Sequence, residues 1–169
     1  VRDGALDESC YDLLASEACL ASFIAIAKGD LPARHWFRLG HSVTPVTGGA
    51  ALQSWSGSMF EYLMPALIMH APSQSIIGRT NRAVIRRQIE FAKALAMPWG
   101  ISESAYNARD LHMTYQYSNF GIPGLGLKRG LGEDAVVAPY ATALAAIIDP
   151  IAAARNFRRL ADYGARGRF

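Results

Sequence analysis

The sequence predicts an all-α fold built from helical hairpins. Three observations lead to this prediction: apolar residues recur at helical spacing in several segments, Pro and Gly stand where helices would begin and end, and no stretch reads convincingly as a strand. The 169 residues suffice for one domain with a single sizeable core. We therefore expect helices separated by two long loops that gather at one end of the molecule.

The first part of the chain is expected to contain two helices and one long loop. Asp7 can cap a helix that runs to about Lys28, with a Gly immediately after it as a stop signal. Residues 31–55 contain Pro32, Pro45, Gly48 and Gly49 without a sustained period, which is typical of a loop. A second helix is expected from about Ser58, and Pro65 should kink it or end it early.

The second part of the chain is expected to contain three more helices. Residues 76–97 form the clearest amphipathic pattern, with apolar residues on one side and charged residues on the other. Residues 98–132 are irregular and rich in Gly, and are predicted as the second long loop. Helices are expected again at about 139–148 and from Pro150 to a cap at Gly164.

Composition excludes several classes of protein. A hydrophobic fraction of 51% with only 18% charged residues is too apolar for a disordered chain. The net charge of +3 comes from scattered Arg and Lys, without the basic stripe that a nucleic acid would require. No apolar run is long enough for a membrane span. The two Cys are expected to be buried and reduced, and the four His lack metal-ligand spacing, so no metal site is expected.

Glu61 is the only formally charged residue between Arg38 and Arg79, which makes it a candidate functional group. Two interpretations are open. With Ser58 it matches a capping box, in which the Glu side chain reaches back to the N–H of the cap residue. Alternatively, its aromatic neighbours raise its pKa by desolvation, as a general acid near neutral pH requires.

Two further carboxylates and a group of aromatic residues suggest carbohydrate chemistry. Glu17 lies in a nearly uncharged predicted helix and is either a solvated surface residue or functional, and Glu103 lies in the second loop. Cleaving a glycosidic bond needs two carboxyl groups, so Glu17, Glu61 and Glu103 are the candidates. Aromatic faces stack on sugar rings, although core packing is the alternative. The aromatic candidates are Trp36, Trp55, Trp99, Tyr106, Tyr115 and Tyr117.

Three motifs, in this order, give the chain a specific resemblance. They are SWSGSMFEYLMP at 54–65, PWGISESAYN at 98–107, and YQY at 115–117 followed by GLGLKRGL at 124–131. They resemble the glycoamylase-like domain of bacterial cyclic β-1,2-glucan synthases, and the likeness extends over nearly the whole chain. The resemblance implies an α/α toroid of six helical hairpins. With about five predicted helices, residues 1–169 would be a partial domain of a much longer chain.

The resemblance also implies a cellular setting and partners. Such synthases are inner-membrane proteins in which a membrane glucosyltransferase uses UDP-glucose and a phosphorylase-like domain adjusts chain length. This chain would then be a soluble part of the same polypeptide, on the cytoplasmic side. It would act on the β-1,2-glucan chain and need no cofactor of its own.

The implied reaction is closure of a linear glucan into a ring with net retention. We expect Glu103 as nucleophile and Glu17 as acid/base, with Glu61 as a substitute for either role or as a ligand of a glucose hydroxyl. Alternatives are a β-1,2-glucan hydrolase and a non-catalytic module that holds the glucan. The expected substrate contacts outside the first loop are Trp99, Tyr106, Asn107, Arg109, Asp110, Tyr115, Gln116 and Tyr117, to which Trp36 and Trp55 of that loop are added.

Overall fold

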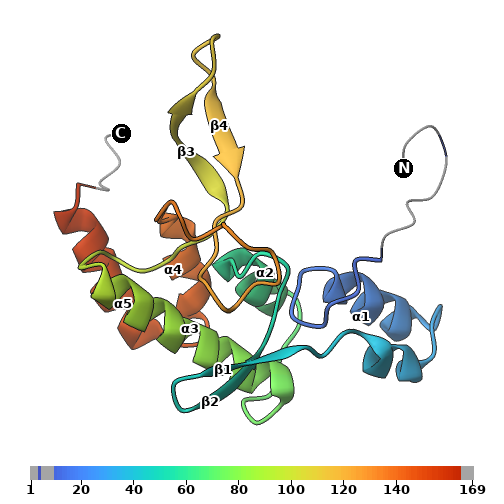
Figure 1. The fold of residues 1–169 in the computed structure, drawn as a ribbon. Helices are drawn as coiled ribbons and strands as arrows, with labels where there is room; N and C mark the ends of the chain where they lie inside the picture. Colours follow the sequence, from blue (N-terminus) through green and yellow to red (C-terminus); the bar gives the residue numbers. More distant parts are fainter. Residues whose placement is uncertain (1–3, 5–9, 165–169) are drawn as a thin grey trace.

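A computed structural model describes residue 4 and residues 10–164 of the chain. This part contains five α-helices, two short 3₁₀ helices and two hairpins, and their arrangement can be followed in Figure 1. In chain order the elements are α1 (Cys19–Lys28), η1 (Ala33–Arg38), β1 (Val43–Val46), β2 (Gly49–Leu52), α2 (Met59–Leu63), η2 (Met64–Leu67), α3 (Ile76–Ala94), β3 (Ser104–Arg109), β4 (Tyr115–Ser118), α4 (Pro139–Ala146) and α5 (Pro150–Asp162).

The prediction of an all-α fold, and of a toroid made only of helical hairpins, is wrong. Each of the two segments predicted as long loops contains an antiparallel hairpin, β1–β2 and β3–β4. The first hairpin turns tightly at Gly48, whose φ of 80° is natural for Gly and costly for other residues. Strands of four to six residues are too short to show a clear period in the sequence. The hairpins also lie apart, with β3–β4 projecting away from the body of the molecule (Figure 1).

Helix α1 is shorter than predicted, because it begins only at Cys19. The predicted cap, Asp7, lies outside the described residues. Before α1, the backbone forms a parallel bridge between Leu13 and Gly40. Leu14 donates its N–H to the Gly40 carbonyl at 3.0 Å, so this stretch is extended and not helical. The predicted stop is present, since Gly29 ends the helix with a φ of 83°.

The remaining helices agree with the predicted segments. Helix α3 begins after Ser75, whose hydroxyl accepts the N–H of Gly78 at 3.1 Å. Helix α2 ends two residues before Pro65, which lies in η2, and Pro150 is the first residue of α5. In the described part of the chain, no helix has both the length and the apolar character needed to cross a bilayer.

Two fully buried amide side chains fix the strand-like segment that precedes Glu103. Gln88 on α3 accepts the N–H of Ile101 and donates to its carbonyl, both at 2.9 Å. Asn156 on α5 pairs in the same way with Trp99, at 3.1 and 2.8 Å. These bonds satisfy buried backbone groups that lack a neighbouring strand. Residues 99–101 are therefore a rigid base for Glu103.

The ends of the two long segments meet at closely packed glycines. Ser54 donates its N–H to the Leu125 carbonyl at 3.1 Å, and its own carbonyl accepts the N–H of Leu127 at 2.9 Å. A Cβ on Gly121 would lie 1.8 Å from the carbonyl oxygen of Ser56, so any side chain there would displace the backbone. Thus, although the hairpins diverge, residues 54–57 are held against residues 121–127.

Candidate active site

The three glutamates singled out in the sequence lie around one tyrosine, Tyr11. The Tyr11 hydroxyl donates to Oε1 of Glu17 at 3.0 Å. The pKa of Tyr11 is raised, first by burial and then by the negative charges of Glu17, Glu61 and Glu103. Residues separated by up to 92 positions in the chain therefore act on one hydroxyl group.

Glu17 lies in the turn just before α1, and not in the middle of a helix as predicted. Its carbonyl accepts the N–H of Leu20 at 3.1 Å, which fixes its backbone at the start of the helix. Its side chain is half-buried, and Oε2 is a buried atom with no hydrogen-bond partner among the described residues. A buried carboxylate oxygen without a partner is costly, and it marks a place where a ligand or water can bind.

Trp55 lies beside Tyr11 and presents a second buried polar atom. The two rings stack, with centroids 5.6 Å apart and an angle of 14° between planes. The indole Nε1 of Trp55, a donor, has no acceptor among the described residues. The region around Tyr11 thus offers an unpaired acceptor on Glu17, an unpaired donor on Trp55 and an aromatic face, all suited to a hydroxylated ligand.

Glu61 is held by hydrogen bonds from its own segment. Its side chain is 4% exposed, and Oε2 accepts from the hydroxyls of Ser54 and Ser56 at 2.6 Å each. It also accepts the N–H groups of Ser56 at 2.9 Å and Gly57 at 3.2 Å. These four donors replace the apolar surroundings expected from the sequence and hold Oε2 in place, whereas Oε1 accepts only the N–H of Ser56, at 3.3 Å.

Only half of the predicted capping box forms. The hydroxyl of Ser58 accepts the N–H of Glu61 at 3.4 Å, as a cap residue does. The Glu61 side chain, however, does not return to the N–H of Ser58, which donates to the Ser56 hydroxyl at 3.3 Å. The carboxylate instead organises residues 54–57, the segment that contains Trp55.

We expect Glu61→Gln to destabilise the purified chain by about 3 kcal/mol, because an amide nitrogen would face buried donors and leave them unpaired. The measurement is urea unfolding, in which the midpoint should fall while the slope stays constant. The matched control is Glu133→Gln, since Glu133 is exposed and its replacement should change stability by less than about 0.5 kcal/mol. Equal midpoints for the two variants would contradict the structural role of Glu61.

Glu103 is half-buried at the base of β3, and its pKa is raised. Burial is the main cause, and the charges of Glu17 and Glu61 add to it, while a hydrogen bond from Tyr117 acts in the opposite direction. The Tyr140 hydroxyl lies 2.7 Å from the Glu103 carbonyl oxygen, so α4 also fixes this residue. A carboxyl group with a raised pKa keeps its proton to higher pH.

The end of the β3–β4 hairpin is shaped by several of the predicted substrate contacts. The guanidinium of Arg109 lies 4.3 Å from the centre of the Tyr115 ring, and its Nη2 donates to the Tyr115 hydroxyl at 2.5 Å. Asp110 accepts the N–H groups of His112 and Thr114, which closes the turn. These contacts stabilise the hairpin, which projects from the body (Figure 1), while Tyr117 on β4 is the member whose hydrogen bond lowers the pKa of Glu103.

The other predicted contacts fall into two groups. Asn107 is exposed on β3, and Gln116 on β4 donates to the Thr114 carbonyl at 3.3 Å. Tyr106 is half-buried and packs edge-on against Phe120, with centroids 5.0 Å apart. These residues belong to the hairpin or to its packing against the body.

Two predicted aromatic contacts lie away from the three glutamates. Trp99 is only 4% exposed, and its ring packs in the core, where no sugar can stack on it. Trp36 lines an apolar cavity of about 280 Å³ between α1 and η1, together with Phe23 and Phe37. Of the three tryptophans, only Trp55 contacts the site.

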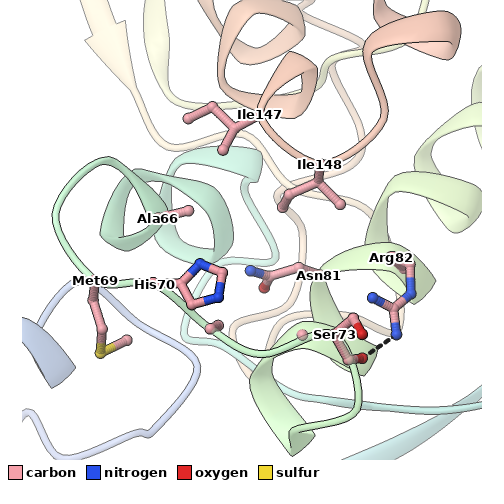
Figure 2. A pocket seen from close by; sticks show the side chains of 10 residues that line it. Ala66, Met69, His70, Ser73, Asn81, Arg82, Ile147 and Ile148 are labelled. Carbon is pink, nitrogen blue, oxygen red and sulfur yellow. Dashed lines mark hydrogen bonds between the residues drawn. The ribbon is translucent and has the colours of Figure 1, made fainter.

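A different cavity, of about 220 Å³, lies between α3, the segment before it and the α4–α5 turn (Figure 2). His70 and Asn81 face each other across it, and Arg82 donates to the Ser73 carbonyl. None of the ten lining residues is Asp or Glu, so this cavity lacks the groups for glycoside chemistry. Within residues 10–164, no three His, Cys, Asp or Glu residues are grouped as metal ligands.

Sequence reasoning missed Tyr11, Tyr140 and the pair Ser54 and Ser56. The serines could have been found, because small hydroxyl residues beside a lone Glu are the donors that a buried carboxylate needs. Tyr11 had no signal in the sequence, since it belongs to the site only through the path that residues 11–17 take beside Gly40.

Comparison with known proteins gives two findings. A family profile described as putative glucoamylase matches residues 9–167. The chain is also 56% identical, over all of its 169 residues, to the cyclic beta-(1,2)-glucan synthase NdvB of Rhizobium meliloti (strain 1021). The matched region makes up 6% of the length of that relative.

Proposed function

Since this chain belongs to the putative glucoamylase family, we propose that it provides a carbohydrate-active site that closes linear β-1,2-glucan into a ring. The hydrogen bond between Tyr11 and Glu17, with Glu103 near enough for its charge to raise the pKa of Tyr11, supports this most directly. Two carboxyl groups beside a stacked aromatic pair are the equipment that exchange of glycosidic bonds requires. The name of the 56% identical relative supports β-1,2-glucan as the substrate.

Ring closure by this site is a double displacement with retention. One carboxylate attacks the anomeric carbon of a glucosyl unit, and the second protonates the departing oxygen. The second group then removes the proton from the hydroxyl at the free end of the same glucan, whose oxygen displaces the enzyme carboxylate. One glycosidic bond breaks and one forms, so neither water nor an activated donor is consumed.

We assign the nucleophile to Glu17 and the acid/base to Glu103, the reverse of the assignment made from the sequence. No donor among the described residues engages Oε2 of Glu17, so no hydrogen bond holds back the nucleophilicity of this oxygen. The raised pKa of Glu103 favours a group that begins the reaction protonated. The hydrogen bonds of Glu61 support a structural role in place of the substitute catalytic role.

The test uses a chimera in which this chain replaces the matching segment of the Rhizobium meliloti synthase. The chimera is incubated with linear β-1,2-glucan, without UDP-glucose or phosphate, so that chain growth and phosphorolysis do not occur. We expect products one water lighter than linear chains of equal length, read by mass spectrometry. The departing part of each glucan is released as a shorter linear chain alongside the ring. Shorter linear chains without any ring would instead indicate a hydrolase, and unchanged substrate would indicate a module that holds the glucan.

A further inference from the structure

We propose that Tyr11 is a positioning residue that orients the Glu17 carboxylate for attack on the sugar. This inference rests on the proposed function, because it assigns a partner to the nucleophile named above. Its basis is the 3.0 Å hydrogen bond from the Tyr11 hydroxyl to Oε1 of Glu17 and the packing of the Tyr11 ring on Trp55.

The backbone between Tyr11 and Glu17 is fixed. The carbonyl of Asp12, next to Tyr11, accepts the N–H of Gly40 at 2.8 Å, and Leu14 bonds back to Gly40 at 3.0 Å. A Cβ on Gly40 would lie 2.9 Å from Cδ2 of Leu13, so the two segments approach closely. The segment that contains Tyr11 is thus anchored by backbone hydrogen bonds, so the position of Tyr11 does not depend on burial of its side chain.

Burial does not explain the position of the Tyr11 ring. The side chain is 50% exposed, so it contributes little to the core. Its ring lies nearly parallel to that of Trp55, whose segment is organised by Glu61. A half-exposed tyrosine held by stacking, with its hydroxyl directed at a carboxylate, is suited to orientation and not to packing.

The hydrogen bond divides the two oxygens of Glu17 between two tasks. The terminal torsion of a Glu side chain has a broad energy profile, so a carboxylate without a partner rotates. Donation from Tyr11 to Oε1 fixes this torsion and leaves Oε2, a buried atom with no partner among the described residues, without a competing hydrogen bond. Orientation of a nucleophile is a large part of its advantage over a free reactant.

The test compares Tyr11→Phe, which keeps the ring and removes the hydroxyl, with Tyr163→Phe in the same chimera. Tyr163 is exposed at the end of α5 and donates to the Ala96 carbonyl, away from the three glutamates. We expect Tyr11→Phe to lower kcat by about ten-fold or more while KM changes little, because loss of a hydrogen bond to a charged group affects the attacking carboxylate. Tyr163→Phe should leave kcat unchanged.

Crystal structures of the chimera and its Tyr11→Phe variant give a readout that does not depend on activity. We expect one orientation of the Glu17 carboxylate in the parent and several in the variant. The same single orientation in both, or a kcat for Tyr11→Phe equal to that of Tyr163→Phe, would overturn the inference. If the parent chimera is inactive but the Glu17 carboxylate is still ordered in the parent and disordered in Tyr11→Phe, the proposed function is refuted and the positioning role of Tyr11 is not.

Discussion

Glu17→Ala in the chimera is expected to lower the rate of ring closure by about 10⁴-fold or more. A carboxylate held beside the anomeric carbon replaces a reaction between separate molecules, which is where much of the rate of covalent catalysis originates. Glu17 is only half-buried, and its Oε2 has no partner among the described residues, so its truncation should leave the fold intact. The measurement is the rate of cyclic product formation, with unfolding followed in parallel.

Azide identifies the role of Glu17 as well as its importance. In Glu17→Ala, azide can occupy the vacated space and attack the anomeric carbon directly, giving a glucosyl azide of inverted, α configuration. The substrate is a linear β-1,2-glucan with a nitrophenyl leaving group. A β-configured azide from this variant would assign Glu17 to the acid/base, as the sequence had suggested. Glu133→Ala, at an exposed position, is the matched control and should behave as the parent.

The sequence predicted the helices whose ends carry strong local signals. Ser75 and Pro150 start their helices and Gly29 stops one, because caps and backbone restrictions depend on the nearest residues only. The hairpins were missed for a different reason. A strand forms only when a second strand pairs with it, as Ser104 pairs with Ser118 and Val46 with Gly49. The four strands are also too short for an alternation of apolar and polar residues to be visible in the sequence.

The sequence identified the charged residues of the candidate site but not their arrangement in space. Glu17, Glu61 and Glu103 were found because carboxylates are conspicuous in uncharged stretches, and all three act on Tyr11. Their separate roles depend on contacts that the sequence does not display. Glu61 was expected in apolar surroundings but is surrounded by donors from residues 54–57, whereas Glu103 is desolvated.

Glu103→Gln is expected to reduce ring closure by about 10²-fold to 10⁴-fold, the contribution typical of a positioned general acid. Gln matches Glu in shape but cannot donate or recover a proton at the glycosidic oxygen. In the first step, read as release of nitrophenol in the first turnover, the loss should be much smaller with a nitrophenyl leaving group, which departs without protonation. A loss of the same size with both substrates would contradict the acid/base role.

The pH dependence of the parent chimera follows from the raised pKa of Glu103. The first step needs Glu103 protonated, and because the pKa is raised, the alkaline limb of kcat/KM should lie at higher pH than the ordinary carboxyl value of 4.5. Glu103→Gln should lack this limb.

With azide and the nitrophenyl substrate, the Glu103→Gln variant should give a β-configured azide, because azide then attacks the glucosyl unit held on Glu17.

Stability supplies the final distinction between a catalytic and a structural Glu103. Folding favours the protonated form of a carboxyl group whose pKa is raised, so its contribution to stability is present at low pH and is lost as pH rises through the folded-state pKa. Removing the charge should therefore leave the unfolding midpoint of Glu103→Gln at neutral pH equal to or above that of the parent. If the unfolding midpoint of Glu103→Gln instead falls as far as that expected for Glu61→Gln, the loss of activity in Glu103→Gln would be explained by destabilisation of the fold.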